Sequence, residues 1–295
     1  MNIKEALKKA TTELNEKNIE SANLKARMLI EYVLYKPRQY IVANDMEELT
    51  IEQKNRYFEL VEKLKMNIPL EHIINKKEFM GLNFFVNENV LIPRQDTEVL
   101  VEEVINIVNK LDLNKEDKST CLQKIKILDL CTGSGAIAIS LAKYIENALV
   151  VATDISERAL EVAIRNAKEN NMEVIFIKSD LFEKFEKDET SAKDKFDVIV
   201  SNPPYIKKEV IEKLDEQVKK EPIIALDGGA EGLDFYKKIV KEAHKYLNEN
   251  GFLCLEIGYD QKEEVTNLIK NEKIYKDIYC IKDLNGNDRV IVAKK

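Results

Sequence analysis

The stretch that decides the fold is Ile127-Leu128-Asp129-Leu130-Cys131-Thr132-Gly133-Ser134-Gly135-Ala136-Ile137-Ala138. Its apolar first part predicts a buried strand, its centre a glycine-rich turn, and its end the start of a helix. Gly133 and Gly135 can adopt positive φ angles, and free N–H groups of the turn and the first helical residues can point at a ligand. We therefore expect a nucleotide-type cofactor site, with the candidate residues Asp129, Thr132, Gly133, Ser134, Gly135 and Ala136.

From residue 124 onward, strand and helix patterns alternate around this stretch. We expect strands at 125–130, 148–154, 174–179, 196–201, 251–257, 277–283 and 288–293. Helical patterns occupy 136–146, 157–170, 234–248 and 260–271, and the lysine-rich stretch 183–195 is expected to be a solvated loop. Such alternation predicts an α/β fold with a doubly wound, mostly parallel seven-stranded sheet. Asn285-Gly286-Asn287 is typical of a hairpin turn, so the last strand is expected to be antiparallel.

Upstream of the sheet, the pattern changes twice. Residues 1–75 carry apolar side chains at helical spacing and almost no turn residues, which predicts a small helical bundle. Residues 76–92 are expected to form a connecting β-hairpin with its turn near Asn87-Glu88-Asn89. Pro93 marks a break before a helix expected from Thr97 to Asn109. The predicted domains are thus 1–75, the connector 76–92, and 93–295.

Composition restricts the class of protein. The 295 residues are 44% hydrophobic and 34% charged, with a net charge of −7 and no basic stripe, so we expect no direct nucleic-acid contact. The four cysteines form no Cys-x-x-Cys pair and only two histidines are present, so we expect no metal site. The N-terminus lacks a signal-peptide pattern, and no apolar run is long enough for a membrane helix. We therefore expect a cytoplasmic protein.

Two further acids mark the cofactor site. Asp154 ends the predicted second strand, nineteen residues after Gly135, where a carboxylate reaches ribose hydroxyls in doubly wound folds. The same pattern fits a dinucleotide, but the acidic Asp129 would repel a pyrophosphate and attract the ammonium group of S-adenosyl-L-methionine. We therefore favour S-adenosyl-L-methionine over NAD. Asp180 and Leu181 end the third strand where adenine is commonly contacted, although a solvated strand end or a helix cap explains Asp180 equally well.

The fourth predicted strand ends in Asn202-Pro203-Pro204-Tyr205. Two prolines cannot continue a sheet, so the loop is rigid and exposes an amide, unclaimed backbone carbonyls and an aromatic ring. This set suits a planar group with N–H donors, such as an amide or an adenine amino group; the alternative is an ordinary strand-ending turn. Because strands one and four are neighbours at the switch point, the donor methyl group is expected to lie beside this loop.

The chain resembles the peptide chain release factor glutamine methyltransferases, the PrmC/HemK family. The matching segments include Pro69–Ile74, Phe79–Leu82, Val90–Glu98, Thr132–Ala136, Ser201–Ile206, Gly251–Gly258 and Asp288–Val290, with Gln95 where family members often carry proline. The resemblance implies the class I methyltransferase architecture and a helical N-terminal domain that helps bind the partner. It also implies methylation of N5 of the Gly-Gly-Gln glutamine in class 1 release factors, with S-adenosyl-L-homocysteine as product.

The expected acceptor pocket consists of Asn202, Pro203, Pro204 and Tyr205. We expect the Asn202 side-chain carbonyl and the Pro203 backbone carbonyl to accept the two amide N–H bonds, and Tyr205 to cover the amide face. The catalytic candidates are therefore Asn202, Pro203 and Tyr205, and no strong general base is required. Three alternatives stay open: an adenine N6-methyltransferase acting on nucleic acid, a glutamine methyltransferase acting on a ribosomal protein, and a non-catalytic cofactor-binding or assembly protein.

Overall fold

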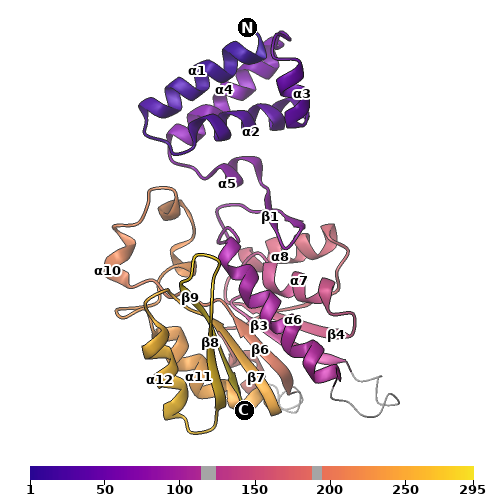
Figure 1. Cartoon of the computed structure of the whole chain (residues 1–295), viewed down its shortest axis with the longest axis vertical. Helices are drawn as coiled ribbons and strands as arrows, with labels where there is room; N and C mark the ends of the chain where they lie inside the picture. The colour runs from indigo at the N-terminus through magenta and orange to yellow at the C-terminus, as the bar shows by residue number, and fades with distance from the viewer. Residues whose placement is uncertain (114–123, 188–194) are drawn as a thin grey trace. The chain divides into compact units, whose positions relative to one another are not determined.

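The computed structural model describes residues 1–113, 124–187 and 195–295. The chain divides into two compact units (Figure 1). The first comprises Met1–Lys76 and Asp215–Lys220, and the second comprises Lys77–Leu214 and Glu221–Lys295. The short segment Asp215–Lys220 thus groups with the helical unit, although both of its chain neighbours belong to the sheet unit.

The first unit is helical, as its apolar spacing predicted. Its helices are α1 (Ile3–Glu16), α2 (Ala22–Leu34), α3 (Arg38–Ala43), α4 (Ile51–Lys65) and α5 (Leu70–Ile74). Asn2 and Thr50 form capping boxes that satisfy the first backbone N–H groups of α1 and α4. The helices bury a common apolar core, in which the hydroxyl of Tyr57 donates to the backbone carbonyl of Ala26 at 3.0 Å. Segment Asp215–Lys220 contains a short 3-10 helix, η4 (Val218–Lys220).

The second unit begins with a β-hairpin, β1 (Lys77–Phe79) and β2 (Leu82–Phe84). Its turn is Met80-Gly81, with φ angles of 49° and 67°, so the predicted turn near Asn87-Glu88-Asn89 is wrong. Two consecutive positive φ angles match the twist of a two-residue hairpin. Residues 87–89 instead close a local turn, in which the backbone N–H of Asn89 donates to the Asn87 side chain at 3.0 Å.

The centre of the second unit is a seven-stranded sheet in the order β5-β4-β3-β6-β7-β9-β8. The strands are β3 (Ile125–Leu130), β4 (Ala148–Asp154), β5 (Ile175–Lys178), β6 (Phe196–Ser201), β7 (Leu247–Glu256), β8 (Lys276–Lys282) and β9 (Asp288–Lys294). Only β9 runs antiparallel to its neighbours, as predicted from the last hairpin. The predicted strand bounds hold to within one residue except for β7, which begins early because Leu247 pairs with Phe196 before a register shift. This confirms the predicted class I methyltransferase architecture.

Helices cover both faces of this sheet (Figure 1). The longer helices are α6 (Glu98–Leu113), α7 (Ala136–Tyr144), α8 (Glu157–Glu169), α11 (Asp234–Tyr246) and α12 (Lys262–Asn271). The first three pack in one apolar cluster and the last two in another. Successive strand residues alternate between the clusters, as Leu253 and Cys254 do, because side chains along a strand point to opposite faces.

The remaining elements are short. They are η1 (Gln95–Thr97), α9 (Glu183–Lys187), α10 (Lys208–Ile211) and η5 (Ile223–Ala225). The predicted solvated loop at 183–195 is therefore wrong for its first five residues, because Phe185 is buried and packs edge-on against Phe196. Residues 188–194 lie outside the described residues. None of the helices in the described ranges has both the length and the apolarity to span a membrane.

Candidate functional site

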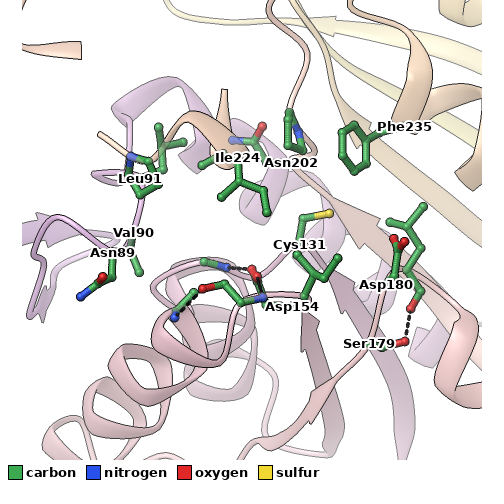
Figure 2. Close-up of a pocket in the computed structure, with 18 of the residues that line it drawn as sticks. Asn89, Val90, Leu91, Cys131, Asp154, Ser179, Asp180, Asn202, Ile224 and Phe235 are labelled. Atoms are coloured by element: carbon green, nitrogen blue, oxygen red, sulfur yellow. Dashed lines mark hydrogen bonds between the residues drawn. The ribbon is translucent and has the colours of Figure 1, made fainter. Parts of the chain in front are cut away.

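A cavity opens at the carboxyl edge of the sheet, where β3, β4, β5 and β6 end (Figure 2). It encloses about 870 Å³ of empty space, its open mouth included. Figure 2 draws Asp154 and Asn202 on opposite sides of this space, with Cys131 between them. Of the sequence-predicted site residues, the cavity is lined by Gly133, Asp154, Asp180, Leu181, Asn202 and Pro204.

Asp154 and the glycine turn form one hydrogen-bonded arrangement. Oδ2 of Asp154 accepts from the Gly133 backbone N–H at 2.9 Å, and Oδ1 accepts from the Ser156 N–H at 2.9 Å. Gly133 and Gly135 have φ angles of 54° and 80°, which confirms the predicted positive φ angles. A Cβ atom at Gly135 would lie 2.9 Å from Cδ1 of Ile139. Burial raises the pKa of the Asp154 carboxyl above its ordinary value, and the backbone N–H groups offset part of that rise.

Asp129 lies inside the protein rather than on the cavity wall. Its Oδ2 accepts from the Thr132 hydroxyl at 2.6 Å, and its side chain is fully buried. Burial raises the pKa of Asp129 to about 7, although the Thr132 hydrogen bond lowers it. Ser134 and Ala136 are also buried, and neither they nor Gly135 are among the residues that form the cavity wall. In this structure Asp129 therefore stabilises the glycine-rich turn from the protein interior, and a contact between Asp129 and the cofactor stays a prediction.

The end of β5 supplies the rim of the cavity. Asp180 is exposed there, and its backbone carbonyl accepts from the Glu183 N–H at 3.0 Å. The Ser179 hydroxyl donates to the Leu181 carbonyl at 2.8 Å and fixes the chain at this point (Figure 2). Leu181 has a φ of 47°, which turns the chain sharply after the strand. The geometry thus leaves the Asp180 carboxylate directed at the opening, available to a ligand or to solvent.

The loop after β6 provides the amide. The Ser201 hydroxyl donates to the Leu130 carbonyl at 2.8 Å, which ties the ends of β6 and β3 together. Nδ2 of Asn202 donates to the hydroxyl of Thr97 at 3.2 Å. Asn202 and Pro204 line the cavity, whereas the ring of Tyr205 packs against the apolar cluster of α11 and α12. The predicted substrate contacts of Pro203 and Tyr205 stay predictions.

Sequence reasoning missed an apolar wall that faces the glycine turn. It is formed by Val90, Leu91, Pro222, Ile224, Ala225 and Phe235. The buried carboxylate of Glu221 joins the first two segments of this wall by accepting from the Ile92 backbone N–H at 2.8 Å and by pairing with Arg94. These segments are far apart in the sequence, so only the structure shows that they meet. Among the described residues, no cluster of three or more histidine, cysteine or acidic side chains could hold a metal ion.

Comparison with known proteins agrees with the geometry. The methyltransferase small domain model matches residues 109–225, which include the glycine turn and Asn202. The hMettl16 catalytic domain, solved with the MAT2A 3'UTR hairpin 6, has a similar fold, with a TM-score of 0.54, 15% identity, and coverage of 72% of this chain and 76% of that chain. The sheet order and the cavity at its carboxyl edge therefore define a class I methyltransferase.

The full chain is similar to a narrower group. The PrmC N-terminal domain model matches residues 5–74. The chain is 40% identical to the release factor glutamine methyltransferase of Clostridium botulinum, with 100% of both chains covered. It is 41% identical to that of Clostridium acetobutylicum, with 99% and 98% covered. The chain belongs to the release factor glutamine methyltransferase family, which confirms the resemblance found in the sequence.

Proposed function

We propose that this protein transfers a methyl group from S-adenosyl-L-methionine to N5 of the Gly-Gly-Gln glutamine in class 1 peptide chain release factors. The observation that carries the proposal is the placement of Asn202 beside the glycine turn at the ends of neighbouring strands. Its Nδ2 is already engaged by Thr97, so its Oδ1 is the atom available to an incoming N–H donor.

The residues around the cavity fit the cofactor. Asp154 carries carboxylate lone pairs for ribose hydroxyls, and the glycine turn keeps bulk away from the ligand. Asp180 offers an acceptor for an adenine amino group at the rim. The apolar wall of Leu91, Ile224 and Phe235 would exclude water from the reacting groups. When bound, S-adenosyl-L-methionine supplies the electrophilic methyl group.

Methyl transfer to an amide nitrogen depends on the alignment of the reacting groups more than on proton transfer. The lone pair of an amide nitrogen is delocalised into its carbonyl, so this nitrogen is a poor nucleophile. Asn202 Oδ1 and the Pro203 carbonyl would accept the two N–H bonds, hold the amide plane and increase electron density on nitrogen. An in-line displacement then depends on distance and direction, which rigid groups supply. The product loses its proton to water, so no dedicated base is required.

The helical unit, Met1–Lys76 with Asp215–Lys220, is the part we assign to binding the release factor. Its own apolar core lets it fold around α1, α2 and α4, and the family model matched to residues 5–74 supports this role. The free cysteines Cys131, Cys254 and Cys280 suit a reducing compartment, and we propose the cytoplasm as the site of action.

The test is mass spectrometry of a release factor after incubation with the protein and S-adenosyl-L-methionine. We expect one added methyl group on the Gly-Gly-Gln glutamine. Asn202→Ala should lower the rate about a hundredfold or more and change cofactor affinity little. The matched control is Asn248→Ala, which removes an amide that bonds Asp197 at the opposite edge of the sheet. Methylation of adenine in DNA or RNA, or of a ribosomal protein, without methylation of the release factor would overturn the proposal.

A further inference from the structure

A buried carboxyl group lies next to the amide of Asn202. Glu256 ends β7, and the register of β6 and β7 pairs Ser201 with Leu255, so Glu256 stands beside Asn202 at the sheet edge. Both side chains belong to the sheet face that α6 covers, because they share the strand alternation of Cys254 and Val200. Glu256 is only 1% exposed, yet it is an acid with no part in the proposed methyl transfer.

The polar atoms around Glu256 converge on the Asn202 amide. Nδ2 of Asn202 donates to Oγ1 of Thr97 at 3.2 Å. Both side chains also lie close enough to the Glu256 carboxyl group to lower the pKa of that group. Its Oε2 has no hydrogen-bond partner within the part of the chain that the structure describes. Oε2 of Glu256 therefore remains an unused hydrogen-bond acceptor beside the Asn202 amide, whose Nδ2 already donates to Thr97.

A salt bridge fixes the segment that carries Thr97. Arg289 on β9 pairs with Asp96 of η1 at 3.2 Å and with Asp283 at 2.9 Å. Its Nη1 also donates to the Ile257 carbonyl at 3.3 Å. The start of α6 is thus joined to β7 and β9, which holds the Thr97 hydroxyl at a set distance from Asn202.

We propose that Thr97 and Glu256 are positioning residues that hold the Asn202 amide with Nδ2 toward themselves and Oδ1 toward the acceptor glutamine, an inference that rests on the proposed function. The two ends of an asparagine amide have nearly the same shape, so packing alone does not choose between them. An ionised carboxylate only accepts hydrogen bonds and therefore selects Nδ2. In the flipped orientation, Nδ2 would face the N–H groups of the glutamine and could accept neither.

The same geometry links this orientation to pH. Burial raises the pKa of Glu256 to about 7, with the Thr97 hydrogen bond and the charge of Arg289 opposing that rise and Asp96 adding to it. A protonated Glu256 can donate to Oδ1 of Asn202, which removes the preference for the active orientation. We expect kcat to rise as pH increases through about 7.

Two tyrosines complete the surroundings of Glu256. Tyr205 follows β6, and Tyr236 on α11 donates its hydroxyl to the Glu256 backbone carbonyl at 2.8 Å. Burial raises the pKa of both phenols above their ordinary value, so neither ionises in the range where Glu256 titrates. The remaining charges nearby are Arg289 and the two carboxylates that pair with it, Asp96 and Asp283.

The test compares kcat and KM for the release factor across pH 5.5 to 9 in full-length variants. Glu256→Gln should lower kcat at pH 8 by about tenfold or more and remove the rise through pH 7, because a glutamine can bond either amide orientation. Affinity for S-adenosyl-L-homocysteine, measured by calorimetry, should stay at the wild-type value. Glu263→Gln, at an exposed carboxylate on α12, is the matched control and should keep the wild-type pH profile.

A second pair of variants covers the case in which Glu256→Gln does not fold. Thr97→Val removes the hydroxyl and should lower kcat without weakening cofactor binding, whereas Thr97→Ser should restore most of the lost rate. A wild-type pH profile in Glu256→Gln, or equal rates in Thr97→Val and Thr97→Ser, would overturn the inference while the proposed function stands. If the wild-type protein leaves the release factor unmethylated, the proposed function fails first.

Discussion

Replacing Asp154 with asparagine tests the cofactor half of the site most directly. Each carboxylate oxygen already accepts one backbone N–H at 2.9 Å, from Gly133 and from Ser156, and keeps a second lone pair for the cavity. An asparagine at this position keeps one oxygen that can accept from one of these two backbone N–H groups. Its NH2 group would face the other backbone N–H and could not accept from it. If the ribose hydroxyls bind here, one charge-assisted hydrogen bond is lost, at about 1.5–3 kcal/mol, and Kd rises about ten- to a hundredfold.

The assay is calorimetric titration of S-adenosyl-L-homocysteine at pH 8, with melting temperatures measured in the absence of ligand. The matched control is Glu157→Gln, which removes an exposed carboxylate that pairs with Lys178 at 2.8 Å outside the cavity wall. It should bind ligand as the wild type does. Because burial raises the pKa of Asp154, the carboxylate is lost at a higher pH than in an exposed aspartate, and wild-type affinity should weaken toward acidic pH. Equal affinity in Asp154→Asn and wild type would refute the assignment of Asp154 to the ribose.

Three further substitutions test the framework of the site by urea denaturation. Gly135→Ala should destabilise the protein by about 1–3 kcal/mol, because the φ of 80° strains an L-residue and the new Cβ lies 2.9 Å from Ile139; an unchanged midpoint would contradict this. Asn166→Ala should cost about 2–4 kcal/mol, because its buried side chain makes three hydrogen bonds to the backbone of Phe85 and Ser134. The pKa of Asp129, raised from 3.8 to about 7, implies a contribution to stability that is full below about pH 4 and lost as pH rises through 7, so Asp129→Asn should flatten the fall in stability between about pH 4 and 7.

Local sequence patterns were enough to predict the sheet and the glycine turn. The apolar period of residues 125–130 and 196–201 gave the strand bounds because burial on both faces requires continuous apolar runs. Gly133 and Gly135 stand in a turn between a strand and a helix, where positive φ angles are needed that other residues rarely tolerate. The hairpin turn was misplaced for the converse reason: Met80 occupies a left-handed conformation that its side chain disfavours, while the asparagines at 87 and 89 looked like better turn residues.

Residues that become neighbours only through the pairing of strands could not be identified from local sequence patterns. Glu256 lies at the end of a strand of apolar residues, and nothing next to it in sequence marks it as a neighbour of Asn202. Thr97 is 105 positions from Asn202, and Arg94 is 127 positions from Glu221. Only the strand order and the packing of η1 on the sheet edge bring these groups together.

The two halves of the site are therefore held by different kinds of interaction. The cofactor half comes from one continuous strand, turn and helix, and its shape follows from backbone geometry within residues 127–154. The acceptor half depends on two buried carboxyl groups: Glu221, which pairs with the partly exposed Arg94, and Glu256, which lies near the charge of Arg289. Burying a carboxylate costs free energy that a nearby cation offsets only in part. Apolar side chains could pack these segments at least as tightly, but they cannot select which end of an amide faces the substrate. A displacement at an amide nitrogen depends on the direction of hydrogen bonds, and in the proposed arrangement Glu256 supplies a direction that apolar packing does not provide.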